Sequence, residues 1–275
     1  MPDTAVVTGA ARGIGRAVAQ RFVDEGWHVV VSDRDADGLE GVAREVGGCP
    51  IVADVSTDAG NTALLDAAFA HLGRVDVFVA NAGIGTGLGL EAPDDVWARA
   101  LDVNVLAHVR AARALVPRWL EAGVPGRFVV TASAAGLLTM LGDAPYSVTK
   151  HAAVAFAEWL DATYRHRGVT VHAVCPQGVD TRMLADAGPL RELLTRDAVV
   201  TPAQVADALW QAMAAGTFLV LPHPEVAEYH VQRASHPDAW LEGMNRLQQK
   251  LERTSTTAPT PIPESTRSTP TQENA

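Results

Sequence analysis

Short runs of β-branched residues alternate with longer amphipathic stretches along most of this chain. Apolar runs of the length of buried strands lie at residues 5–7, 29–31, 50–53, 75–80, 127–131, 170–174 and 218–221. Stretches with apolar residues at helical spacing lie at 13–25, 36–46, 58–72, 94–120, 146–167 and 202–215, the fourth with a bend expected near Pro117. Strands buried on both faces and joined by helical crossovers form parallel sheets. The alternation therefore predicts an α/β protein with a doubly wound, three-layer arrangement around a seven-stranded parallel sheet.

The pattern changes after Leu221. Residues 223–252 are polar with a weak apolar stripe, which predicts a C-terminal helical extension. Residues 253–275 are rich in Thr, Ser and Pro and nearly devoid of hydrophobic residues, which predicts a disordered tail. We therefore expect one large domain over residues 1–222, followed by these two segments.

The composition excludes several classes of partner. A formal net charge of -10 argues against nucleic acid or an anionic membrane surface. No stretch approaches 18 consecutive apolar residues, and the first residues lack the pattern of a secretion signal. The two cysteines, Cys49 and Cys175, give no disulfide framework, so we expect a cytoplasmic protein. Because the histidines are scattered, we expect no metal site.

A glycine trio follows the first expected strand, in Thr8-Gly9-Ala10-Ala11-Arg12-Gly13-Ile14-Gly15. Gly9 would allow a tight turn, Gly13 a close approach of the backbone to a pyrophosphate, and Gly15 close packing of helix on strand. The helix that follows would direct free N–H groups at the phosphates. An ordinary glycine-rich turn is the alternative. The position between a strand and a helix favours a dinucleotide site and a Rossmann fold over residues 1–222.

Polar residues at three further strand ends fit the rest of such a cofactor. Asp33 could accept hydrogen bonds from both ribose hydroxyls of adenosine and would repel a 2′-phosphate, which favours NAD(H). Arg34 and Arg12 lie nearby and could neutralise that phosphate, which leaves NADP(H) as the alternative. Asp54 could bind the adenine amino group, and Asn81-Ala82-Gly83 would pass close to the cofactor. Each of these could instead be a plain solvated turn.

Ser133, Tyr146 and Lys150 carry the strongest chemical signal. Tyr146 and Lys150 are four residues apart at the start of an expected helix, so both lie on one face. A lysine ammonium beside a phenol is expected to lower the pKa of the phenol, which makes tyrosine a usable acid or base. Ser133, at the end of the fifth expected strand, could donate a hydrogen bond to the substrate oxygen.

With these motifs the chain resembles the short-chain dehydrogenase/reductase family, in its single-domain Rossmann branch, over residues 3–222. The matching pieces, in chain order, are Thr8-Gly9, Gly13-Ile14-Gly15, Asp54-Val55, Asn81-Ala82-Gly83, Asn104, Ser133, Tyr146 with Lys150, and Pro176-Gln177-Gly178-Val179-Asp180-Thr181. One departure is visible, because the family often has Pro-Gly in direct succession and here Gln177 intervenes.

The resemblance implies a role for each matching residue. Tyr146 would transfer the proton, Lys150 would hold the nicotinamide ribose, and Ser133 would orient the substrate carbonyl. Asn104 would hold a water in a proton relay through Lys150. The implied cofactor contacts are Gly9, Arg12, Gly13, Ile14, Gly15, Asp33, Arg34, Asp54, Val55, Asn81, Ala82, Gly83, Tyr146, Lys150, Pro176, Gly178, Val179 and Thr181.

These observations predict an NAD(H)-dependent oxidoreductase that interconverts a secondary alcohol and a ketone. Apolar residues in the segments 84–90, 134–141 and 182–200 predict a hydrophobic small-molecule substrate, unless they merely pack against the sheet. The alternatives are epimerase or dehydratase chemistry on the same fold, and a non-catalytic cofactor-binding regulator. By resemblance, the helices at 94–120 and 146–167 would pair subunits into a homodimer or homotetramer.

Overall fold

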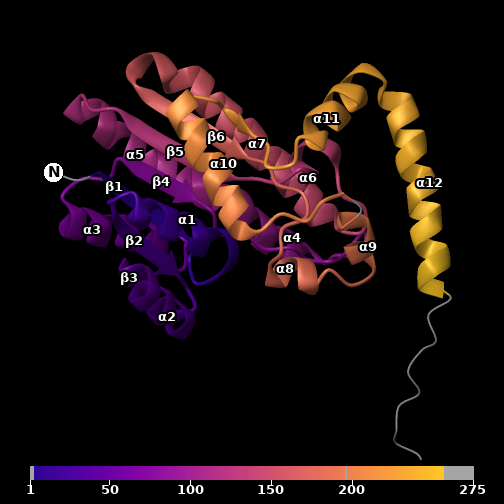
Figure 1. Cartoon of the computed structure of the whole chain (residues 1–275), viewed down its shortest axis with the longest axis horizontal. Coiled ribbons are helices and arrows are strands. Elements are labelled where there is room, and N and C mark those ends of the chain that lie inside the picture. The colour runs from indigo at the N-terminus through magenta and orange to yellow at the C-terminus, as the bar shows by residue number, and fades with distance from the viewer. Residues whose placement is uncertain (1–2, 196, 257–275) are drawn as a thin grey trace, which may run out of the picture.

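The sheet is the centre of a three-layer α/β fold, seen in a computed structural model that describes residues 3–195 and 197–256 (Figure 1). All seven strands are parallel, in the order β3-β2-β1-β4-β5-β6-β7. The strands are β1 (Thr4–Thr8), β2 (His28–Asp33), β3 (Cys49–Val52), β4 (Val77–Ala80), β5 (Gly126–Thr131), β6 (Val169–Val174) and β7 (Leu219–Val220). The strand order reverses between β1 and β4, where doubly wound sheets bind ligands. The predicted fold class is confirmed.

Helices cover both faces of the sheet. The principal ones are α1 (Gly13–Asp24), α2 (Ala36–Val46), α3 (Asp58–Leu72), α4 (Asp94–Leu101), α5 (Ala107–Ala122), α7 (Ala144–Tyr164) and α10 (Pro202–Ala215). Buried residues of α3, α5 and α7 pack on one face, and those of α1, α2 and α10 on the other. Side chains of β1 alternate between the two cores, with Val6 in the first and Val7 in the second, as the two-residue period of a strand requires.

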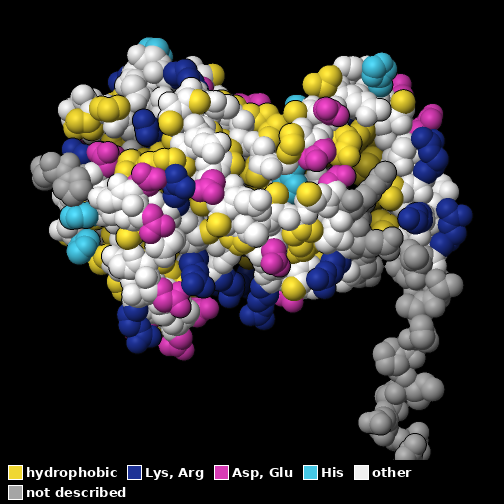
Figure 2. All heavy atoms as spheres, in the orientation of Figure 1, with side chains coloured by type: hydrophobic (Ala, Val, Ile, Leu, Met, Phe, Trp, Pro, Cys, Tyr) yellow, Lys and Arg dark blue, Asp and Glu magenta, His cyan; other side chains and the backbone are white. Residues whose placement is uncertain are grey.

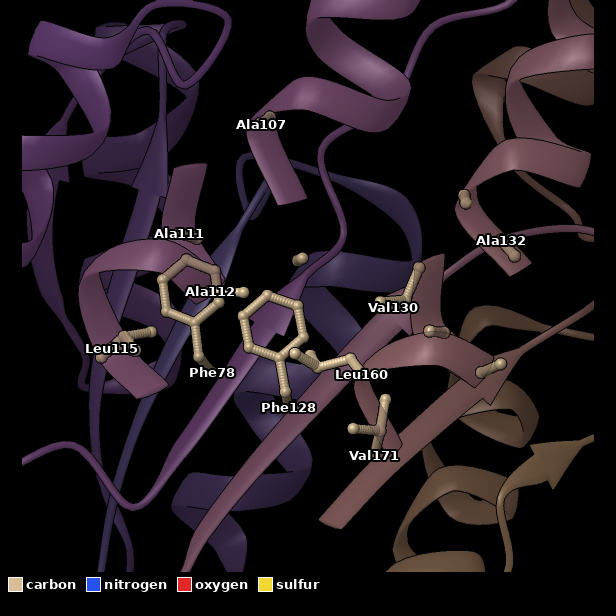
Figure 3. Close-up of a cluster of buried hydrophobic side chains, with 14 of the residues drawn as sticks. Phe78, Ala107, Ala111, Ala112, Leu115, Phe128, Val130, Ala132, Leu160 and Val171 are labelled. Carbon is tan, nitrogen blue, oxygen red and sulfur yellow. The ribbon is translucent and has the colours of Figure 1, made fainter. Parts of the chain in front are cut away.

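Two phenylalanines on neighbouring strands lie at the centre of the first core (Figure 3). Phe78 on β4 and Phe128 on β5 stack with ring centroids 5.5 Å apart and 20° between the planes. Leu115 of α5 and Leu160 of α7 lie beside them, and all four side chains are fully buried. Each such side chain contributes roughly 1.5–3 kcal/mol of hydrophobic stabilisation. This core fixes α7, the helix that carries Tyr146 and Lys150, against β5.

The stretch expected as one helix over residues 94–120 is divided in the structure. A π-helical turn, η1 (Asp102–Leu106), lies between α4 and α5. Pro117 lies inside α5, about three turns after the π turn, and the bend expected near it stays a prediction. A π turn inserts an extra residue into the helix, and such turns are frequent at functional sites. Asn104 lies in this one.

The C-terminal extension also differs from the single stretch that we expected. It forms two helices, α11 (Glu225–Ser235) and α12 (Pro237–Thr256), which lie at the opposite end of the molecule from α2 and α3 (Figure 1). His236 separates them with non-helical backbone, φ -138° and ψ 63°, and the proline that follows it disfavours helical backbone at this position. The expected tail boundary at residue 253 is too early, since α12 continues to Thr256. Residues 257–275 lie outside the described residues.

Within the described part of the chain, no helix is long and apolar enough to cross a membrane. No group of three or more potential metal ligands occurs in that part either. Acidic and basic side chains are intermixed over the face shown in Figure 2. The absence of a nucleic-acid partner and of a metal stay predictions.

Candidate active site

A cavity of about 1300 Å³ lies outside the carboxyl ends of the strands, beside the point where the strand order reverses. Most of the residues predicted from the sequence line it. They are Gly9, Arg12, Gly13, Ile14, Asp33, Arg34, Asp54, Val55, Asn81, Ala82, Gly83, Ser133, Tyr146, Lys150, Pro176, Val179 and Thr181. Three predicted residues, Gly15, Asn104 and Gly178, do not line it.

The glycine turn between β1 and α1 has the shape that a bound pyrophosphate needs. Gly9 has a φ of +63°, and a Cβ there would lie 2.8 Å from the Cα of Ala82. A Cβ on Gly15 would lie 2.3 Å from the main-chain oxygen of Gly9, so Gly15 serves close packing of the helix on the turn. No side chain caps the N-terminus of α1, and its first turn holds no acidic residue. Its free N–H groups therefore fit a phosphate.

Asp33 and Asp54 lie where the adenosine half of a dinucleotide would bind. Asp33 Oδ2 accepts a hydrogen bond from Ala11 N over 3.1 Å, which fixes the carboxylate at the end of β2. The main-chain N–H and the side chain of Ser56, with the positive charge of Arg34, hold the pKa of Asp54 below its ordinary value. This end of the cavity therefore carries two carboxylates.

Two basic residues, Arg12 and Arg34, line the adenosine end of the cavity. Arg12 forms an ion pair with Asp35 over 3.6 Å. Each arginine thus has a carboxylate nearby, Asp35 for Arg12 and Asp54 for Arg34, and both are candidates for contact with a 2′-phosphate.

Asn81, which follows β4, links the end of that strand to the turn after β1, where the strand order reverses. Its amide nitrogen donates to the main-chain oxygens of Thr8 and Gly9, over 3.0 and 3.2 Å. Just beyond it, a Cβ on Gly83 would lie 3.3 Å from Lys150 Nζ. Asn81 therefore shapes the turn, and Gly83 leaves room at Lys150.

Ser133, Tyr146 and Lys150 meet in the wall of the cavity, and all three are buried. Lys150 Nζ donates to the main-chain oxygen of Thr131 over 2.8 Å and lies 5.5 Å from the centre of the Tyr146 ring. Ser133 Oγ accepts from Ala135 N over 3.1 Å. The sequence prediction that these three residues converge agrees with this geometry.

Burial dominates the ionisation of the two titratable residues in this group. It raises the pKa of Tyr146, an effect that the hydrogen bond with Ser133 opposes and the charge of Asp143 reinforces. It also lowers the pKa of Lys150 to about 8. Burial is thus the largest cause of the shift at Tyr146, and the expected lowering of its pKa by Lys150 stays a prediction. Tyr146 is therefore a neutral phenol, which is a proton donor, near pH 7.

Asn104 supports the site from behind the cavity wall. Its Oδ1 accepts from Ile84 N over 2.8 Å, and its Nδ2 donates to Ile84 O over 2.9 Å and to Thr149 Oγ1 over 3.0 Å. Protein groups thus occupy the side-chain amide, which anchors the loop after Gly83. The proton relay through Asn104 stays a prediction.

The inserted Gln177 has its own set of partners. Its main-chain N–H donates to His223 Nδ1 over 3.1 Å, and its side chain donates to Asp197 over 2.9 Å. The opposite ring nitrogen of His223 lies 3.1 Å from the main-chain oxygen of Gly178. The loop still brings Thr181 beside the glycine turn, with its methyl group 3.3 Å from the position of a Cβ on Gly13. The insertion is therefore accommodated without removing Val179 or Thr181 from the cavity.

Comparison with known proteins agrees with this geometry. The sequence profile of the short chain dehydrogenase family matches residues 3–191. The chain belongs to this family.

Among its relatives is the 1-deoxy-11-beta-hydroxypentalenate dehydrogenase of Streptomyces avermitilis, 37% identical over 82% of this chain and 86% of the relative. A short chain dehydrogenase/reductase from Burkholderia phymatum, solved in complex with NAD, superposes with a TM-score of 0.80, at 28% identity over 88% of this chain and 95% of that one. Actinorhodin polyketide ketoreductase, solved with NADPH, superposes with a TM-score of 0.73, at 28% identity over 80% of this chain and 94% of that one. This protein is an oxidoreductase of the family, acting on a CH–OH group.

The substrate side of this short-chain dehydrogenase matches the expected apolar segments only in part. Ile84, Met140 and several side chains of the segment 182–200 line the cavity. By contrast, Leu90 is 99% exposed. Leu137 and Leu138, which are part of α6 (Ala135–Leu138), are buried in the core. In that core α6 contacts α7 and α11 (Glu225–Ser235), and neither leucine lines the cavity.

Sequence reasoning missed one buried acid of this dehydrogenase, Asp143, which lines the cavity three residues before Tyr146. The signal was available, because Asp143-Ala144-Pro145 is a typical helix start with an acidic N-cap and an early proline. Its partner, Thr86, lies 57 residues earlier and could not be paired with it from the sequence.

Proposed function

We propose that this short-chain dehydrogenase interconverts a secondary alcohol and a ketone on a hydrophobic small molecule, with NAD(H) as cofactor and Tyr146 as the acid or base. One observation carries the proposal. Ser133, Tyr146 and Lys150 are buried together in the wall of a cavity whose other half has the turn, the helix N-terminus and the carboxylates that fit a dinucleotide.

The protein side of the reaction follows from the ionisation of these residues. In reduction, Ser133 Oγ orients the carbonyl oxygen and the neutral phenol of Tyr146 donates a proton to it. In oxidation, Tyr146 must first lose its proton, so the rate rises with pH. Lys150 carries a positive charge below pH 8, which stabilises the phenolate as it forms. The nicotinamide, when bound, supplies or accepts the hydride.

Residues 9, 12–14, 33, 54 and 81–83 line the cavity and would hold the cofactor, with Gly15 packed behind the turn. The carboxylate of Asp33 supports NAD(H), because it opposes a 2′-phosphate. Solved relatives were obtained with NAD and with NADPH, so the preference is decided by this chain's own residues. Arg12 and Arg34, which both line the cavity, are the residues that would favour NADP(H).

The walls beyond Tyr146 support an apolar substrate. Side chains of Met140, Met183, Leu184 and Leu190 line that end of the cavity. Its basic residue, Arg182, is exposed and pairs with Asp186 over 3.3 Å. A hydrophobic pocket of this kind favours an apolar alcohol over a sugar phosphate. The relative from Streptomyces avermitilis is itself named for a hydroxylated substrate.

Two further proposals concern the cellular location and the oligomeric state of the protein. Both cysteines are free, which supports a cytoplasmic location. Exposed apolar side chains on α4, η1 and α7, namely Leu101, Leu106, Val148 and Trp159, support a homodimer or homotetramer through that face.

The test is net turnover of the cofactor. Secondary alcohols and ketones, cyclic apolar ones beside polyols, are offered with NAD(H) and NADP(H), and absorbance of the reduced nicotinamide is followed. We expect net oxidation or reduction, fastest with NAD(H) and an apolar cyclic compound. Product formed without net cofactor change would point to epimerase or dehydratase chemistry instead.

A further inference from the structure

A glycine-rich loop, Ile84-Gly85-Thr86-Gly87-Leu88, follows the cofactor-side turn and forms one wall of the cavity. Glycine has many accessible backbone conformations, so such a loop has little rigidity of its own. Hydrogen bonds from residues outside the loop hold it in place. Asn104 bonds both main-chain groups of Ile84, and Ala144 N donates to Leu88 O over 2.9 Å.

The centre of the loop is held by one carboxylate. Asp143 Oδ2 accepts from Thr86 N over 2.6 Å and from Gly87 N over 2.7 Å. Its Oδ1 accepts from Thr86 Oγ1 over 2.6 Å and from Tyr146 N over 2.9 Å. The side chain is 2% exposed, so none of these bonds is weakened by solvent.

This arrangement exceeds what a helix N-cap requires. An N-cap side chain satisfies N–H groups in the first turn of its own helix, as Asp143 does for Tyr146 N. Here three of the four donors come from the 84–88 loop. No basic residue forms an ion pair with Asp143 in the part of the chain that the structure describes, so the hydrogen bonds alone satisfy a buried acid.

We propose that Asp143 is a positioning residue for the reaction, which fixes the 84–88 wall of the substrate site to the first turn of the helix that presents Tyr146. The inference rests on the proposed function of Tyr146. It predicts that loss of the loop contacts reduces turnover even where the helix cap survives. It also predicts an electrostatic effect, because the carboxylate lies close to the phenol.

The charges around Tyr146 define that effect. They are Asp143 at the start of α7 and Lys150 one turn after Tyr146, while the thiol of Cys175 after β6 is neutral because burial raises its pKa to about 12. The 84–88 loop adds no titratable side chain. The negative charge of Asp143 raises the pKa of Tyr146. Removal of this negative charge should therefore move the acidic limb of the pH profile of kcat for oxidation to lower pH.

Two substitutions at Asp143 separate the functions of its carboxylate. Asp143→Asn removes the charge and places an amide donor against the N–H groups of the loop. Asp143→Ser still caps the helix but is too short to reach the loop. For both we expect kcat to fall at least about tenfold, with the KM for cofactor changed less than about threefold. For both the acidic limb should move down by about half a pH unit.

Two further variants serve as controls. Thr86→Val keeps the charge and the cap, so it should lower kcat without moving the limb. Asp76→Asn removes a carboxylate that also accepts several hydrogen bonds, from Thr4 N, Thr4 Oγ1 and Arg74. Asp76 lies at the amino ends of the strands, away from the cavity. It should lower stability and leave the profile unchanged.

Amide hydrogen exchange gives a readout that needs no substrate. Exchange at Thr86 and Gly87 should speed up at least about tenfold in both Asp143 variants and stay unchanged in Asp76→Asn. This result would support the positioning role even if the wild-type protein turned over no alcohol or ketone, which would overturn the proposed function instead. Unchanged exchange, or wild-type kcat in Asp143→Ser, would overturn the inference.

Discussion

Lys150 donates a hydrogen bond from Nζ to the main-chain oxygen of Thr131 over 2.8 Å, which joins α7 to the carboxyl end of β5. The same ammonium lies 5.5 Å from the centre of the Tyr146 ring. A buried cation is thus held beside the proposed proton donor by a neutral carbonyl group. Burial lowers its pKa to about 8, which means that the arrangement costs stability.

Replacement of Lys150 by methionine should separate stability from activity. With a folded pKa of about 8 against an ordinary 10.5, the charged lysine opposes folding by roughly 3 kcal/mol below pH 8, and this penalty disappears as pH rises through 10.5. Loss of the bond to Thr131 offsets about 1 kcal/mol of the gain. Denaturant unfolding at pH 7 should therefore show Lys150→Met to be about 2 kcal/mol more stable, yet nearly inactive. A less stable variant would contradict this account.

Cofactor choice should depend on Asp33. Asp33→Ala removes the charge that opposes a 2′-phosphate and leaves Arg34 in place. We expect the ratio of kcat/KM for NAD(H) over NADP(H) to fall about tenfold or more, mainly through KM for NADP(H). Asp37→Ala, an exposed carboxylate in the first turn of α2, is a matched control that should leave the ratio unchanged. A wild-type protein that prefers NADP(H) would refute the assignment.

Acid sensitivity should come in part from His108. It is fully buried, neither ring nitrogen has a hydrogen-bond partner among the described residues, and its pKa is lowered to about 3, chiefly by burial. The unfolded chain takes up this proton near pH 6.5, so stability falls by up to about 1.4 kcal/mol for each pH unit between 6.5 and 3. His108→Leu should thus lose about 2 kcal/mol less than wild type between pH 7 and pH 5. The surface variant His71→Leu should behave as wild type, and equal losses in all three proteins would count against the prediction.

The oligomer should depend on Trp159. It is 56% exposed, and Val148 lies on the same side of α7, three turns earlier. Trp159→Asp should therefore lower the mass measured by light scattering at micromolar concentration. Val124→Asp, which alters an exposed valine just beyond α5, should not change it. A monomeric wild-type protein would remove the basis of the prediction.

The sequence was most informative where its signals are local. The bounds of α2, α3 and α10 were predicted to the residue, and in the structure each begins after an N-cap side chain that favours a helix start, Asp35, Thr57 and Thr201. Seven short apolar runs, each followed by a helical stretch, were enough to predict the parallel sheet. Among the residues that line the cavity, Asp33, Asp54 and Ser133 followed from their place at strand ends, which the fold brings together, whereas Pro176, Val179 and Thr181 followed only from the family resemblance.

Other features depend on tertiary contacts. Helical periodicity gives no sign of the π turn around Asn104, since one inserted residue hardly alters the apolar pattern. The raised pKa of Tyr146 follows chiefly from the burial of its phenol. The bonds between Asp143 and Thr86 join segments 57 residues apart. Such relationships appear only once the chain is folded.

The central claim is that Tyr146 transfers the proton, and Tyr146→Phe tests it most directly. The substitution keeps the ring and its packing and removes only the hydroxyl. Turnover is measured with a substrate accepted by wild type, and binding of NADH is measured by fluorescence titration. We expect kcat to fall about 10²–10⁴-fold and the Kd for NADH to change less than about threefold. A variant that keeps more than about one tenth of the wild-type kcat would contradict the central claim, because the proton would then come from another group.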